Sequence, residues 1–210
     1  VRQRGGLEAK TSSHSSESLS QSDFVLFFQQ IRNFLTVQEQ LDLFSKWRQR
    51  GSSEAGFLGV MAMVAAGFSQ RKPERLQQAR KLLKGLDLPD LDRHPLLGCM
   101  DLLLADVKQA EERFRNSSDE GLKNWLENYP GEYLGALCDY CRDWLRRDVL
   151  PGYRDVEIEP VDLEAWFADR DVQAYVESME RKGALGFAKS GFSFLSSLSS
   201  EKVESDCSEE

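Results

Sequence analysis

The cysteine and histidine side chains are the first candidates for chemistry in this sequence. Cys138 and Cys141 form a CxxC pair, but they fall inside a predicted helix and not at its N-terminus, where a redox thiolate would be stabilised. His14 falls in a serine-rich stretch and His94 in a predicted loop, so neither has an acid–base setting. We interpret the CxxC pair as core packing, and redox or metal-binding use is the alternative.

Motifs that carry catalysis or hold a cofactor are absent from the sequence. It contains no phosphate-binding loop, no GxSxG elbow and no HExxH. The four cysteines provide no disulfide framework, and no second CxxC or nearby histidine pair completes a zinc site. We therefore predict that the protein is not an enzyme and that it has no catalytic residues, no cofactor and no bound metal.

Aromatic and arginine side chains favour a binding function instead. Tyr140, Trp144 and Arg147 follow one flank of a predicted helix, and Arg142 and Arg146 follow the opposite flank. Tyrosine, tryptophan and arginine are enriched among the residues that dominate binding energy in protein interfaces. These five residues form the predicted partner-binding site.

A basic cluster is a second candidate surface on this acidic chain, whose formal net charge is −8. It could receive an acidic peptide, and solubilising charge on a helix face is the alternative. The cluster consists of Arg71, Lys72, Arg75, Arg80, Lys81 and Lys84.

A long amphipathic helix must position the predicted site. Pro130–Gly131 precedes this helix and Pro151–Gly152 ends it. One buried flank lets the helix join a core, while the other flank can face a partner. At 100° per residue, its apolar face consists of Leu134, Leu137, Cys138, Cys141 and Leu145.

Composition excludes several other classes of protein. The chain has 210 residues, of which 40% are hydrophobic and 30% charged, as in a soluble globular protein with disordered flanks. Its negative net charge argues against nucleic acid as a partner. The longest apolar run, residues 57–68, is too short to span a bilayer. Because the chain begins at Val1, we expect it to be a piece of a longer protein.

Hydrophobic periodicity predicts one folded region between two linkers. Residues 1–22 are rich in serine and are predicted to be a disordered linker. Residues 23–183 are predicted to form an all-helical domain, with a sub-boundary near residue 116 as an option. Residues 184–210 are predicted to be a flexible, acidic, serine-rich linker.

The fold class predicted for the folded region is all-α. Successive helix pairs suggest a solenoid of the tetratricopeptide kind, although their register is too irregular for a true repeat. We predict a degenerate helical array packed on a C-terminal helical bundle. The VEIEPV segment, residues 156–161, could be a strand, but Pro160 and the lack of a partner strand favour an extended connector.

Three runs of sequence resemble a known family. They are LGVMAMVAAGFSQRKPERLQQARKLL, LCDYCRDWLRRDVLPGYRD and WFADRDVQAYVESMERKG, and the matching part covers roughly residues 54–183. These runs resemble the cytosolic helical segment of ZipN, a family of cyanobacterial cell-division proteins related to the plastid-division tether of the inner chloroplast envelope. The blocks at residues 144–155 and 169–181 are the most specific, although neither contains a catalytic residue.

The resemblance implies a membrane-anchored division factor. Such proteins have a J-like domain, a helical cytosolic region, a transmembrane helix and a domain beyond it. They bind FtsZ, through its C-terminal peptide, and so stabilise the Z ring at the cytoplasmic face of the inner membrane. This sequence has no HPD tripeptide and no membrane span. We therefore expect it to be the juxtamembrane segment, with its acidic tail leading towards a span outside this chain.

Two functions follow as hypotheses. The first is an adaptor that binds FtsZ, or another divisome protein, in an apolar groove rimmed by arginines. The alternative is a scaffold or spacer that mediates self-association or contacts to divisome proteins without binding FtsZ.

Overall fold

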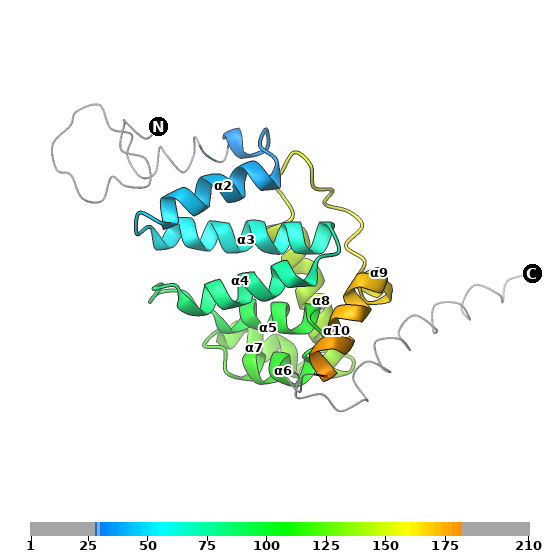
Figure 1. The fold of residues 1–210 in the computed structure, drawn as a ribbon. Coiled ribbons are helices and arrows are strands. Elements are labelled where there is room, and N and C mark those ends of the chain that lie inside the picture. Colours follow the sequence, from blue (N-terminus) through cyan, green and yellow to red (C-terminus); the bar gives the residue numbers. More distant parts are fainter. Residues whose placement is uncertain (1–27, 29, 182–210) are drawn as a thin grey trace, which may run out of the picture.

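Every regular element in the described part of the chain is a helix. The computed structural model describes residues 28 and 30–181, and Figure 1 shows their arrangement. The predicted all-α fold is confirmed. The linkers predicted at 1–22 and 184–210 lie outside the described residues, and the predicted boundaries, including the one near residue 116, stay predictions.

The first helices stack side by side (Figure 1). α3 is the central member and packs against both α2 and α4. Thr36 and Glu39 form the reciprocal capping box that starts α2. Pro73 is the first residue of α4, where its missing N–H costs little. The bounds are α2 (Val37–Arg48), α3 (Ser53–Ser69) and α4 (Pro73–Gly85).

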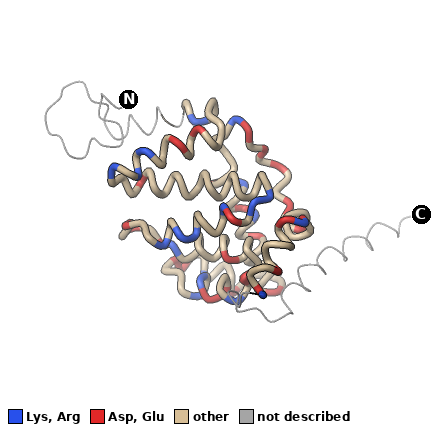
Figure 2. The backbone as a smooth tube through the Cα atoms, viewed as in Figure 1, with Lys and Arg blue, Asp and Glu red and all other residues tan. Residues whose placement is uncertain are grey.

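Small residues bring the neighbours of α3 close. A Cβ built on Gly56 would lie 2.5 Å from a methyl carbon of Leu86, and one on Gly67 would lie 3.1 Å from Leu76 Cγ. The helix is almost free of charge, as its tan course in Figure 2 shows, because it is enclosed by its neighbours. The missing side chains at Gly56 and Gly67 therefore let Leu86 and Leu76 approach the α3 backbone closely.

A second group of helices follows, with His94 at the start of its first member and not in the predicted loop. Asp101 is fully buried there and forms ion pairs with Arg80 and Arg113, so it joins three consecutive helices. The pKa of Asp101 is raised above its usual value, because the effect of burial outweighs the opposing effect of the Arg80 charge. The bounds are α5 (His94–Leu103), α6 (Val107–Arg115) and α7 (Glu120–Glu127).

The predicted long helix is present but changes geometry near its end. α8 (Tyr133–Trp144) continues directly into a π-helical turn, η3 (Leu145–Val149). The Leu150 N–H donates to the Leu145 carbonyl at 2.9 Å, which closes the wide turn. The turn ends before Pro151–Gly152, where Gly152 has a φ of +95°.

The remaining helices cover one side of the array. A connector without regular structure, residues 150–162, leads to α9 (Leu163–Ala168) and α10 (Arg170–Arg181). Its residues 156–161 form no strand, as predicted. Trp166 of α9 donates a hydrogen bond to the Leu103 carbonyl at 2.8 Å, so α9 is joined to α5. No helix among the described residues has the length and apolar character needed to cross a membrane.

The connector is also bonded to the start of the array. Four hydrogen bonds join segments that lie more than a hundred residues apart in the chain. They run from Arg32 Nη2 to the Pro151 carbonyl, from Gln40 Nε2 to the Gly152 carbonyl, from the Val37 N–H to Asp155 Oδ1, and from the Arg154 N–H to the Leu35 carbonyl.

Candidate interaction groove

Two hollows adjoin each other along α8 and η3. The first has a volume of about 510 Å³ and lies towards α7, whereas the second has a volume of about 490 Å³ and lies towards α2 and α3. The two hollows share Tyr140, Trp144, Arg147 and Asp148. We call the two together the α8 groove. Three of the five residues predicted to bind a partner, Tyr140, Trp144 and Arg147, therefore lie where the two hollows meet.

Aromatic side chains line the first hollow. Trp125 of α7 is 42% exposed and packs edge-on against Tyr129, with its ring centroid 6.4 Å from that of Tyr140. The Tyr140 ring in turn packs edge-on against Phe114. Burial raises the pKa of Tyr140 to about 12, so its hydroxyl stays protonated and can donate a hydrogen bond.

The second hollow is mainly apolar. Phe44 of α2 forms part of its wall and packs edge-on against Phe28. Leu58 and Met61 of α3 face it from the central helix. Its remaining lining residues are Arg32, Gln40, Phe57, Leu91, Leu96 and Tyr153, besides the four shared ones.

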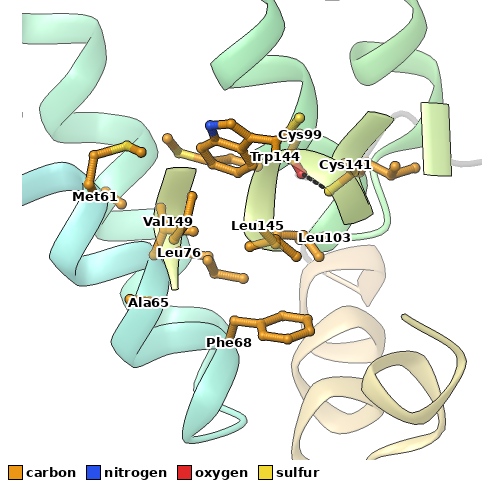
Figure 3. Packing of buried hydrophobic residues seen from close by; sticks show 14 of the residues in the cluster. Met61, Ala65, Phe68, Leu76, Cys99, Leu103, Cys141, Trp144, Leu145 and Val149 are labelled. Atoms are coloured by element: carbon orange, nitrogen blue, oxygen red, sulfur yellow. Dashed lines mark hydrogen bonds between the residues drawn. The ribbon is translucent and has the colours of Figure 1, made fainter. Parts of the chain in front are cut away.

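Trp144 forms the floor of the groove and not an exposed rim. Its side chain is only 5% exposed and lies among buried residues of α3 and α5 in Figure 3. The sequence placed Trp144 on an aromatic flank that could face a partner. The structure corrects that expectation, because α3 packs against η3 and encloses the indole. Tyr140, by contrast, is half-buried and reaches the groove surface.

Arg142 and Arg146 are occupied by carboxylates. Arg142 pairs with Asp139 and, at 3.5 Å, with Glu164 of α9. Arg146 lies 3.4 Å from Asp143 and 3.9 Å from Glu159 of the connector. Arg142 lines the first hollow beside Tyr140, which differs from the opposite flank expected, whereas Arg146 lines neither hollow.

Arg147 is the predicted arginine that faces the groove without a partner. It is exposed, lines both hollows, and forms no hydrogen bond or ion pair with the residues that the structure describes. The groove thus combines apolar walls, a tyrosine hydroxyl and one uncompensated guanidinium. This composition suits an apolar peptide segment that carries a carboxylate.

Comparison with known proteins identifies the family. The family model of the plastid division regulator (ARC6) alpha solenoid domain matches residues 34–190. The chain belongs to this family. No curated protein and no solved structure matches it. The match gives the chain a role in the regulation of division, and it supports the family relationship that the ZipN resemblance implied.

Two members of the predicted basic cluster, Arg71 and Arg80, interact with other parts of this ARC6-family chain. Arg80 turns towards buried Asp101, and the Arg71 guanidinium lies over the rings of Phe68 and Trp166, 5.5 and 5.7 Å from their centroids. Figure 2 shows basic residues along α4, with acidic residues towards its ends. Arg71 and Arg80 are therefore engaged within the protein, whereas Lys72, Lys81 and Lys84 remain exposed.

The CxxC cysteines of the ARC6-family domain are part of its core. Cys99, Cys138 and Cys141 are all buried, and the Cys141 thiol donates to the Cys99 carbonyl at 3.8 Å (Figure 3). Burial raises the pKa of Cys138 to about 12 and also raises that of Cys99. No group of side chains suited to a metal occurs among residues 28 and 30–181. The interpretation as core packing agrees with these positions.

We expect these three thiols to be unreactive in the folded protein. Reaction with an alkylating reagent at neutral pH should leave Cys99, Cys138 and Cys141 unmodified, because a buried, protonated thiol is a poor nucleophile. Mass spectrometry of peptides after brief alkylation, with and without urea, checks this. Rapid modification of Cys138 without urea would revive the redox interpretation.

Three contributors to the groove were missed by sequence reasoning. Trp125, Asp148 and Met61 line it but were not among the residues predicted to bind a partner. The signal available for Trp125 was its spacing of four from Tyr129, which places both rings on one side of α7 and its end. No local pattern indicates which of these elements would meet.

Proposed function

We propose that this chain binds the C-terminal peptide of FtsZ in the α8 groove and so helps to stabilise the Z ring at the membrane. The support is that the chain belongs to a family of division regulators and has two adjoining hollows that together could receive a peptide. The proposed place of action is the cytoplasmic face of the inner membrane at the division site. Attachment there would need a span outside this chain.

The groove indicates how such a peptide would be held. Apolar side chains would enter the second hollow, towards Leu58 and Met61, and an aromatic or proline residue would lie against Trp125. A carboxylate would pair with Arg147. Because Arg142 and Arg146 are already paired, the arginine rim first expected reduces to one free cation. Affinity would therefore come mainly from apolar burial.

The primary test is a titration of a fluorescently labelled FtsZ C-terminal peptide with the full 210-residue chain, followed by anisotropy at low and high salt. We expect saturable binding that salt weakens only slightly, as one exposed ion pair would allow. No saturable binding by a chain with a native circular dichroism spectrum would overturn the proposal.

Arg147→Glu should weaken peptide binding about tenfold, because an attractive exposed pair is replaced by a repulsive one. Lys81→Glu is the matched control. Lys81 is exposed on α4, outside the groove, and its reversal changes net charge by the same amount. Equal affinities for the two variants would remove Arg147 from the site. Reversing Arg142 and Arg146 as well is less informative, because their ion pairs would break too.

The alternative function is a scaffold or spacer that self-associates or contacts other divisome proteins without binding FtsZ. Its support is Phe34, whose side chain is 73% exposed and which a second copy could cover. Analytical ultracentrifugation separates the two functions. A stable dimer that does not bind the peptide favours the scaffold, and a monomer that binds favours the adaptor.

A further inference from the structure

Arg147 and Asp148 form an adjacent pair of opposite charges on η3. Both are exposed and both line the two hollows of the α8 groove. Adjacent residues of a helix point in different directions, so the two side chains do not neutralise each other face to face. A ligand in the groove therefore meets a cation and an anion at neighbouring positions.

The other charged side chains that line the groove have partners. Asp139 pairs with Arg142, Asp143 with Arg146, and Arg32 donates to the Pro151 carbonyl. Among the described residues that line the groove, Arg147 and Asp148 are the charged ones with neither a hydrogen bond nor an ion pair. An electrostatic preference of the groove must come mainly from these two.

The π-helical turn determines where the two charges lie. Leu145 and Val149 are fully buried at its two ends, whereas the three residues between them are exposed. The turn loses the tighter α-helical bonding pattern, and such turns recur at functional positions. Here it carries Arg147 and Asp148 to the junction of the hollows.

We infer that Asp148 is a specificity-determining residue of the α8 groove. The groove selects an apolar peptide segment that carries a carboxylate for Arg147 and, close to it, a lysine or arginine for Asp148. A uniformly acidic segment is disfavoured, because it brings a like charge to Asp148. This inference rests on the proposed peptide-binding function, and it refines the earlier expectation of an apolar groove rimmed by arginines.

The test uses three labelled forms of the FtsZ C-terminal peptide and the full-length chain. One peptide is native, one has Gln or Asn in place of its acidic residues, and one has Gln in place of its lysines and arginines. Each is titrated against the unaltered chain, Arg147→Gln, Asp148→Asn and the control Asp87→Asn. Asp87 is an exposed acid outside the groove, so its change matches the loss of charge at Asp148.

Replacing the peptide's basic residues should weaken its binding to the unaltered chain, and to the Asp87→Asn control, about threefold. The same replacement should not change the affinity of the peptide for the Asp148→Asn variant. Loss of the peptide's acidic residues should likewise weaken binding to the unaltered chain about threefold, and it should have no effect on binding to Arg147→Gln. If Asp148→Asn stays fully sensitive to loss of the basic residues, or if the unaltered chain is insensitive to it, the inference is wrong while peptide binding stands. If the native peptide does not bind, the proposed function fails and the inference fails with it.

Discussion

Trp166→Ala should lower the free energy of unfolding by about 4 kcal/mol, the range of a large aromatic side chain removed from a packed core. Trp166 is fully buried, and its ring stacks on Phe68 of α3 with centroids 5.3 Å apart. Its indole N–H also satisfies the Leu103 carbonyl of α5. One side chain thus holds α9 to two helices of the array. Urea denaturation followed by circular dichroism measures the loss.

Two control variants test whether the loss of stability comes from the contacts of Trp166 and not from the removal of any tryptophan. Trp125→Ala removes the same side chain from a partly exposed position and should cost less than about 1 kcal/mol. Trp166→Phe keeps a ring against Phe68 but leaves the Leu103 carbonyl without its donor, so it should cost an intermediate amount, about 2 kcal/mol. If Trp166→Ala costs no more than Trp125→Ala, α9 does not pack on the array as described.

Gly98→Ala should lower the free energy of unfolding by about 2 kcal/mol, although alanine favours helices. A Cβ on Gly98 would lie 2.6 Å from Cε2 and 2.7 Å from Cδ2 of Phe114. The Phe114 ring is fully buried and packs edge-on against Tyr140, so it has little room to move. The added methyl group would force α5 and α6 apart.

Gly59→Ala is the matched control for Gly98→Ala. Gly59 also lies within a helix, but a Cβ there would lie 3.6 Å from Phe44 Cβ, an ordinary contact. The variant should therefore be stabilised by about 0.5 kcal/mol through its higher helix propensity. If Gly98→Ala lowers the free energy of unfolding and Gly59→Ala raises it, the close approach of α5 and α6 at Gly98 is the cause of the difference. A stabilised Gly98→Ala protein would contradict it.

Helix positions could be predicted because their signals are local. The Thr36–Glu39 capping box and the early Pro73 can each be recognised within one turn of sequence, and both start helices in the structure. The absence of a strand at residues 156–161 was predictable for the same reason, since Pro160 interrupts any strand pattern. These features depend on neighbours in the chain, which the sequence displays directly.

The environment of the site residues depends on distant segments and could not be predicted. A helical wheel places Trp144 on a flank of α8, but the burial of its ring depends on the approach of α3. Likewise, the wheel gives no indication that Glu164 and Glu159 would neutralise Arg142 and Arg146. Tyr140 and Arg147, which the wheel placed on one flank, do line the same groove, although a π-helical turn begins between them.

The hydrogen bonds between the connector and the start of the array have a mechanical consequence. An open solenoid under tension extends like a spring, because the load passes through each helix pair in series. Here Arg32 and Val37 are bonded directly to Pro151 and Asp155. A pull between residues 28 and 155 would pass across this short bridge, and most of the load would bypass the helices between residues 41 and 149 while it holds. The array is thus built as a closed link, whose internal packing is shielded from force applied at its ends.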